Sequence, residues 1–123
     1  MGRRYGLKDN IVYEKAFKFA IQIVDLYKYL SKEKNEYILS KQLLRAGTSI
    51  GANIKEGIEG QSTRDFLSKM SIALKEASET EYWLELLIST NYIEKEPYKG
   101  ILEDCKELNR ILTAIIRTTK NKL

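Results

Sequence analysis

Residues 42–57 read QLLRAGTSIGANIKEG and place an apolar side chain on every helical turn. Together with Leu39, just before this stretch, the apolar residues recur three or four positions apart, which puts them on one face of an α-helix: Leu39, Leu43, Ala46, Ile50 and Ile54. A polar strip runs beside them at the same spacing: Lys41, Arg45, Ser49, Asn53 and Glu56. We therefore predict an amphipathic helix over about residues 36–56, with Gly57 as the residue that ends it.

Two glycines interrupt this helix at Gly47 and Gly51. Each glycine costs about 1 kcal/mol of helix stability relative to alanine, so a close contact must offset that loss. Glycines four residues apart share a face and let a second backbone approach. We predict that this face lies in a helix contact and place both glycines in an interface between subunits.

Helical spacing continues outward on both sides of this stretch. It predicts three more helices, over about residues 11–30, 63–90 and 97–120, with a flexible arm at residues 1–10. Asp9 or Asn10 can cap the first helix, and Ser62 with Asp65 resembles a capping box for the third. Short polar connectors favour antiparallel neighbours, and no segment has the pattern of a strand. The fold class is all-α: a single domain, residues 1–123, forming an up-down-up-down four-helix bundle.

Two helices carry more apolar surface than one bundle needs. Phe17 and Val24 widen the stripe of the first helix, and Ile72, Trp83 and Leu86 form a second strip on the third, opposite its inner residues. The inner residues of the third helix are Phe66, Met70, Ala73, Ala77, Leu84 and Ile88. A second strip on a helix favours contact with another protein surface, so we predict a homo-oligomer. The alternative is that a neighbouring helix or connector partly covers Trp83.

The polar strip of the second helix has a predicted structural role that involves Arg45, Ser49, Asn53, Glu56 and Gly57. In the third helix, Glu81 falls between the directions of two apolar residues. A buried carboxylate needs a partner, and Arg45 is the candidate.

The composition argues against most kinds of active site. The chain has 123 residues and no histidine, which removes the commonest acid-base group and the usual zinc ligand. Its one cysteine, Cys105, lies on an apolar face and is interpreted as a small core residue. We predict a protein that is not an enzyme, binds no metal or cofactor, spans no membrane and is cytoplasmic.

Charge is distributed unevenly along the chain, whose net charge is +4. Residues 1–55 hold eleven Lys/Arg against five Asp/Glu, residues 56–107 hold six against twelve, and residues 108–123 hold four against none. This pattern suits either a bound polyanion or an acidic neighbouring surface. Our leading hypothesis is binding of RNA or DNA through Arg3, Arg4, Lys8, Lys99, Lys106, Arg110, Arg117, Lys120 and Lys122. The alternative is an adaptor that binds only another protein.

The stretch 42–57 also resembles a known family, together with Phe66 and the segment IALKEASETEYWL at residues 72–84. It is similar to the bacterial four helix bundle proteins of the 23S rRNA intervening-sequence family, over about residues 11–120. The residues that carry the pattern are Arg45, Ala46, Ser49, Ile50, Asn53, Ile54, Glu56 and Gly57. Many members have Gly-Ser where this chain has Lys75-Glu76.

The resemblance implies an antiparallel four-helix bundle that assembles as a ring-like homopentamer. The chain is also similar to the accessory protein of diversity-generating retroelements, which binds nucleic acid and a reverse transcriptase. The resemblance implies no catalytic residue.

Overall fold

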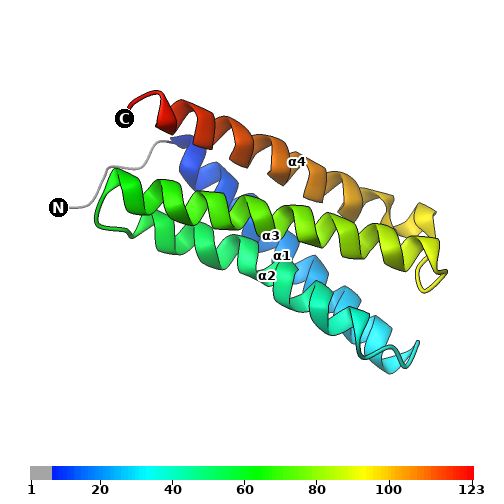
Figure 1. The fold of residues 1–123 in the computed structure, drawn as a ribbon. Helices are drawn as coiled ribbons and strands as arrows, with labels where there is room; N and C mark the ends of the chain where they lie inside the picture. Colours follow the sequence, from blue (N-terminus) through cyan, green and yellow to red (C-terminus); the bar gives the residue numbers. More distant parts are fainter. Residues whose placement is uncertain (1–6) are drawn as a thin grey trace.

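The computed structural model describes residues 7–123, apart from the side chains of residues 7 and 8. It contains four helices: α1 (Leu7–Lys32), α2 (Leu39–Ile58), α3 (Thr63–Ser89) and α4 (Lys95–Lys120). Each helix runs antiparallel to the one before it (Figure 1). The predicted up-down-up-down four-helix bundle is therefore confirmed.

The core consists of one apolar stripe from each helix. The stripe predicted for α2 is fully buried except for Leu39, which is only partly buried, and it packs in one core with Phe66 and Met70 of α3. The stripe of α1 contributes Val12, Ala16, Phe19, Ile23, Leu26 and Leu30, and that of α4 contributes Ile101, Cys105, Leu108, Leu112, Ile115 and Ile116. Burial at helical spacing removes apolar surface from water on every turn, which is what stabilises the bundle.

The two glycines of α2 pack against α1 of the same chain. A Cβ at Gly47 would lie 2.8 Å from two side-chain carbons of Ile23, and a Cβ at Gly51 would lie 3.6 Å from the Cβ of Ala16. The prediction of a close helix contact is right, but its placement between subunits is wrong. Helix α1 already occupies the space that the glycines leave.

The first helix begins earlier than predicted. Helix α1 starts at Leu7, so residues 7–10 are helical and do not belong to an arm. Asp9 lies within the first turn and is buried, so neither Asp9 nor Asn10 is the cap that we predicted. An acidic residue in the first turn still favours the helix, because the amino end of a helix carries partial positive charge. Residues 1–6 of the predicted arm lie outside the described residues.

Helix α2 is fixed at its start by Glu36, which we had placed inside the helix. The Glu36 carboxylate accepts hydrogen bonds from the backbone N–H groups of residues 38, 39 and 40 at 3.2, 3.0 and 2.7 Å. Burial alone would raise the pKa of Glu36, but these backbone hydrogen bonds outweigh it and hold the pKa below its usual value. The carboxylate therefore satisfies N–H groups that the helix itself cannot.

The connection from α2 to α3 differs in part from the prediction. Helix α2 continues past Gly57 to Ile58, so Gly57 does not end it but is buried against α3. Ser62 caps α3 as predicted, with its side chain accepting from the Asp65 N–H at 3.1 Å. The carboxylate of Asp65 accepts in turn from the N–H of Gln61, one residue before the cap.

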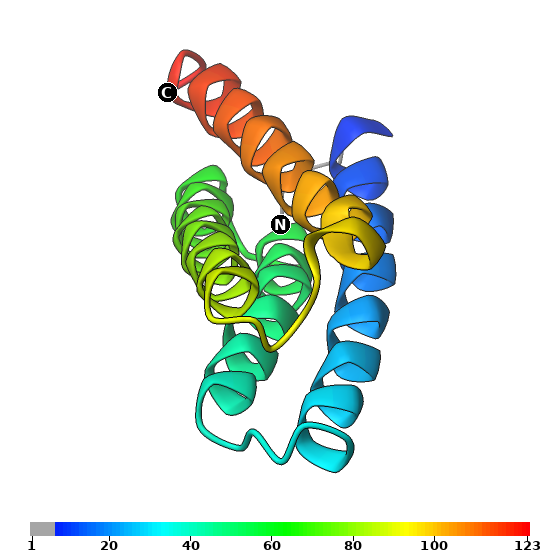
Figure 2. The same ribbon diagram turned by 90° about the vertical axis from the view of Figure 1, so that its right-hand side faces the viewer.

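The seam between α1 and α4 is the most weakly packed of the four. The two helices diverge toward the carboxyl end of α4 (Figure 2). Lys15 and Glu107 bridge the seam with an ion pair at 3.3 Å. The described helices include none that is long and apolar enough to cross a membrane.

Candidate functional site

Helix α4 presents a cationic stripe to solvent. Lys99, Lys106, Arg110 and Arg117 are spaced at multiples of helical turns, so they share one face of α4, with only Lys106 half-buried. Within residues 9–123, none of these four side chains forms an ion pair. The α4 stripe is the name we give to these four residues.

Acidic residues lie near the α4 stripe on both of its sides. Glu107 lies on the side of α4 that faces α1, where it pairs with Lys15. Glu103 stays close to the stripe, and with Glu85 of α3 it lines a groove that also contains Lys99 and Lys106. Lys120 and Lys122 are exposed beyond the stripe and extend the positive charge to the carboxyl end.

The structure does not place the other three predicted nucleic-acid-binding residues, Arg3, Arg4 and Lys8, beside the α4 stripe. Arg3 and Arg4 lie outside the described residues. Lys8 belongs to the first turn of α1, and its side chain is also outside the description. The candidate surface therefore consists of α4 and the residues after it.

A second polar site lies along the seam between α2 and α3. Arg45 forms ion pairs with Glu76, at 3.2 Å, and with Glu79. The predicted buried pair between Arg45 and Glu81 is wrong. The side chain of Arg45 is half exposed, and Glu81 accepts instead from the Asn109 amide of α4 at 3.2 Å.

This error comes from the direction in which Glu81 points. It lies on the α4 side of α3, whereas Glu76 and Glu79 lie on the α2 side. The sequence did contain information about the partner of Arg45, because the short connector between α2 and α3 fixes which residues of the two helices lie opposite each other. Equal counts in both directions from the turn near Gly60 place Arg45 close to Glu76.

The rest of the polar strip holds α2 and α3 together or stabilises α2 itself. Glu56 pairs with Lys69 of α3 at 3.0 Å. The Ser49 hydroxyl donates to the Arg45 carbonyl, and the Asn53 amide donates to the Ser49 carbonyl, both along α2. Sequence reasoning missed Lys69 as a partner because its position opposite Glu56 depends on how the two helices are aligned.

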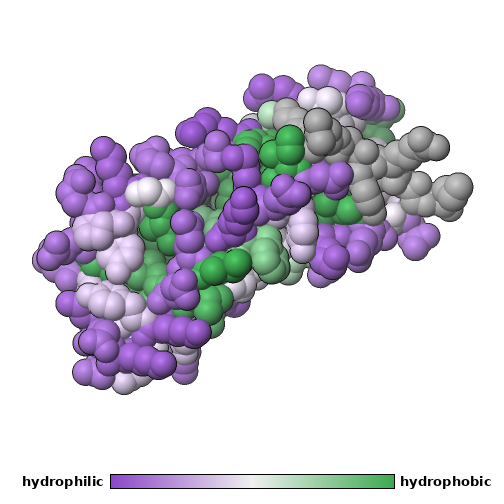
Figure 3. Space-filling model, turned by 180° about the vertical axis from the view of Figure 1, so that it is seen from behind, coloured by the Kyte–Doolittle hydropathy of each residue, from purple (hydrophilic) through white to green (hydrophobic). Residues whose placement is uncertain are grey.

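Two groups of apolar side chains remain accessible on the protomer, on either side of α2. The first, which we call the α1 patch, consists of Phe17, Ile21 and Val24, with Phe17 56% exposed. Figure 3 shows the molecule from behind the view of Figure 1, and hydrophobic side chains are visible there among hydrophilic ones. The neighbouring Tyr13 ring lies beneath the Lys55 ammonium of α2, which places the patch beside α2.

The second group, the α3 patch, consists of Ile72, Trp83 and Leu86. Ile72 is 38% exposed, and Trp83 and Leu86 are half-buried. The Trp83 indole N–H donates to Glu79, the residue that binds Arg45 of α2, at 3.4 Å. This hydrogen bond places the patch on the opposite side of α2 from the α1 patch. The protomer alone encloses neither Trp83 nor Phe17.

The sequence matches the family model of the 23S rRNA-intervening sequence protein over residues 8–114. The chain belongs to this family. A crystal structure of a family relative, described as a protein with unknown function from the S23 ribosomal protein family of Bacteroides thetaiotaomicron, is 56% identical. The match has a TM-score of 0.88 and covers 90% of this chain and 99% of the relative. Among curated proteins, none matches the chain.

Membership of the intervening-sequence protein family agrees with the residues that carry the resemblance. Three of them lie on the seam between α2 and α3: Arg45 pairs with Glu76 and Glu79, Glu56 pairs with Lys69, and Gly57 packs closely on Lys69. Ala46, Ile50 and Ile54 are buried in the core, and Ser49 and Asn53 form hydrogen bonds along α2. The family pattern in this chain therefore has a structural explanation. It does not by itself indicate a ligand.

The thiol of Cys105 lies in the interior of the protein and is unreactive. Cys105 is fully buried and donates a hydrogen bond to the Ala77 carbonyl at 3.3 Å. Burial, and secondly the negative charges of Glu81 and Glu85, raise its pKa to about 12. A thiol that stays protonated is a poor nucleophile, so Cys105 is a core residue. The described residues include no group of His, Cys, Asp and Glu that could hold a metal ion.

Proposed function

We propose that this protein is a non-enzymatic oligomer that binds the phosphate backbone of RNA or DNA through the α4 stripe. The observation that carries this proposal is the set of cations on one face of α4 that have no ion-pair partner among residues 9–123. Lys and Arg in this arrangement neutralise phosphates and release counterions, which favours binding to any sequence.

The length of the α4 stripe suits a nucleic acid. Eighteen residues separate Lys99 from Arg117, which is about 27 Å along a helix at 1.5 Å per residue. A duplex carries one negative charge per roughly 1.7 Å of its axis, so the stripe can reach several phosphates at once. Four cations give modest affinity for one protomer, and several protomers multiply it by avidity.

The two apolar patches support self-association. They differ in composition and lie on different faces of the protomer, so one patch of one subunit can meet the other patch of the next. Contacts between unlike surfaces close into rings when the rotation between subunits permits. This arrangement is compatible with the homopentamer that the family resemblance implies.

Self-association predicts a particle several times heavier than the 14.3 kDa chain. Replacing Phe17→Glu places a charge in the α1 patch, and we expect it to reduce the particle to a monomer that remains folded. Light scattering coupled to size exclusion measures the mass, and circular dichroism checks the fold. Tyr37→Glu is the matched control, because Tyr37 is 51% exposed but lies outside both patches. A wild-type monomer at micromolar concentration would contradict the oligomer.

Nucleic-acid binding is tested by fluorescence anisotropy with labelled RNA and DNA at low and high salt. Arg110→Glu with Arg117→Glu removes two contacts and adds two repulsive charges, so we expect affinity to fall by at least about tenfold. Lys28→Glu with Lys75→Glu makes the same change of net charge on exposed positions of α1 and α3 and should change affinity much less. Absence of binding at low salt, or equal losses in both double variants, would reject the α4 stripe as the binding surface.

A protein-binding adaptor is the second candidate. It is favoured by Trp83, which stacks edge-on with the exposed ring of Tyr82 at a centroid distance of 5.1 Å. Aromatic side chains of this kind are common anchors in protein interfaces. Binding through them would respond little to salt, whereas phosphate binding falls steeply as salt rises.

A further inference from the structure

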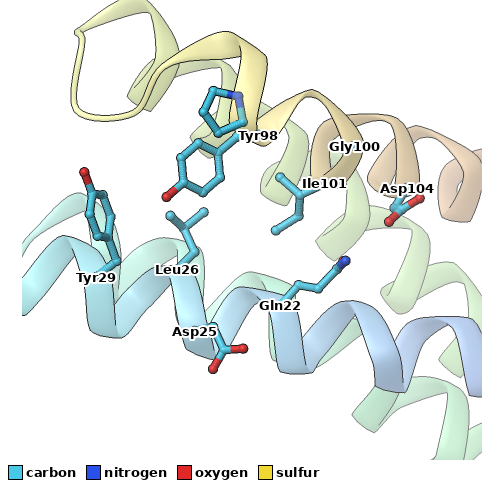
Figure 4. Close-up of a pocket in the computed structure, with 9 residues that line it drawn as sticks. Gln22, Asp25, Leu26, Tyr29, Tyr98, Gly100, Ile101 and Asp104 are labelled. Carbon is cyan, nitrogen blue, oxygen red and sulfur yellow. The ribbon is translucent and has the colours of Figure 1, made fainter.

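A cleft of about 390 Å³ lies between α1 and α4, on the seam that the two helices pack most weakly. Tyr29 and Tyr98 stand at one end of it, and Gln22 and Asp104 at the other (Figure 4). Leu26 and Ile101 lie between these ends. The cleft therefore combines an aromatic end, an aliphatic middle and a polar end with negative charge.

Gly100 is an exposed residue among those that line the cleft. A Cβ at this position would have no neighbouring atom within 4 Å, in contrast to Gly47, where Ile23 fills the space. A glycine inside a helix costs about 0.5–1 kcal/mol relative to alanine. Among the described residues no close contact at Gly100 accounts for that cost, and Gly100 is one of the residues that line the cleft.

The aromatic end attracts a positive charge. The rings of Tyr29 and Tyr98 have centroids 6.3 Å apart, and the Lys34 ammonium lies 5.9 Å from the Tyr29 centroid. An ammonium near a ring face is held by the negative potential of the π system. Burial, and secondly the neighbouring Tyr29, raise the pKa of Tyr98, so its ring stays neutral at ordinary pH.

The charges at the cleft are negative and available. Asp25 and Asp104 both line it, and neither forms an ion pair with any residue in 9–123. Glu107, one turn further along α4, is different because Lys15 already neutralises it. Of the two, Asp104 faces the cleft (Figure 4). A carboxylate that has no ion-pair partner among residues 9–123 and lies beside apolar walls favours a ligand that is cationic and also has an aliphatic part.

We propose that the α1–α4 cleft binds a linear aliphatic polyamine. One ammonium pairs with Asp104 beside Gln22, another lies against the rings of Tyr29 and Tyr98, and the methylene chain covers Leu26 and Ile101. Residues 98 and 104 are about 9 Å apart along α4 at 1.5 Å per residue, which suits a short extended chain with an amine at each end. Asp25 lies at the rim of the cleft, with its side chain directed away from α4 (Figure 4).

The test uses spermidine as the probe and follows the backbone amide signals of the full-length protein by NMR, with calorimetry for affinity. We expect saturable shifts at Tyr29, Tyr98, Gly100 and Asp104. Gly100→Leu adds a large side chain at a residue that lines the cleft, with no protein atom within 4 Å of its Cβ, so it should weaken binding while leaving the fold intact. Ser71→Leu places the same side chain on an exposed part of α3 and should bind as the wild type does.

Charge variants separate a built site from general attraction to a carboxylate surface. Asp104→Asn should weaken binding by about tenfold, the effect of losing roughly 1.4 kcal/mol, while Glu14→Gln on the exposed face of α1 should have no effect. Lys34→Gln removes a competing ammonium from Tyr29 and should strengthen binding several-fold. The proposal is overturned if Gly100→Leu binds as the wild type does, if Glu14→Gln weakens binding as much as Asp104→Asn, or if spermidine shifts no amide at the cleft.

Discussion

Replacing Gly47→Leu is expected to lower the free energy of unfolding by about 3 kcal/mol, at the upper end of the cost of overpacking a core. A Cβ at this position would be 2.8 Å from both Cγ1 and Cγ2 of Ile23. These atoms branch from the Ile23 Cβ, so they cannot rotate away as the end of a long side chain could. The helices α1 and α2 would have to separate, and their shared core would lose contact.

The matched control is Gly51→Ala, one helical turn further along the same face. A Cβ there would be 3.6 Å from the Cβ of Ala16, an ordinary contact, so the gain in helix propensity of about 1 kcal/mol should raise stability. Urea denaturation at one fixed protein concentration measures both variants, because assembly also stabilises the folded state. If Gly47→Leu does not fold, Gly47→Ala replaces it. Equal stability of Gly47→Ala and Gly51→Ala would contradict the close contact with Ile23.

Alkylation of Cys105 in the folded protein is expected to be at least about a thousandfold slower than in the unfolded chain. Raising the pKa from 9.0 to about 12 reduces the thiolate at mildly alkaline pH by that factor, and only the thiolate reacts. Burial of the sulfur slows the reaction further. Iodoacetamide labelling followed by mass spectrometry, with and without urea, measures the two rates.

The protein suits this assay because the chain has one cysteine. A Cys105→Ala variant with Ser71→Cys provides the control, since residue 71 is exposed on α3 and its thiol should react at an ordinary rate. The raised pKa of Cys105 also makes the free energy of unfolding depend on pH. The thiol ionises at lower pH in the unfolded chain than in the folded protein, so stability is lost between about pH 9 and 12. Equal labelling rates in the folded and unfolded states would show that Cys105 is accessible.

Local pattern was enough to predict which residues of α2 face the core. Four of the five predicted residues, Leu43, Ala46, Ile50 and Ile54, are fully buried, because the position of a residue around a helix depends only on its number along that helix. The fifth, Leu39, is the first residue of α2 and is only partly buried. In the long helix α3 the same reasoning missed by one residue near the end. Leu87 is fully buried, whereas Ile88, which we predicted to face inward, is only partly buried.

Contacts between side chains of different helices were harder to predict than which residues of a helix face the core. The charge of Arg45 called for an acidic partner, but three glutamates of α3 lie within two turns of each other. Choosing between them requires the alignment of α2 with α3 and the direction from which each carboxylate leaves its helix. The sequence reasoning chose Glu81, and the structure pairs Arg45 with Glu76 and Glu79. The subunit interface assigned to Gly47 failed for a related reason, because Ile23 of the same chain fills that space.

The sequence by itself determined the four helices, their order, the inner stripe of α2 and the cationic face of α4, since each depends on a period of 3.6 residues within one segment. Only the tertiary structure placed Tyr98 beside Tyr29, left Gly100 without a neighbour and separated the apolar patches on either side of α2. Those features depend on how distant helices pack and where they diverge. Side-chain volumes across the whole core set that packing, and no local period records it.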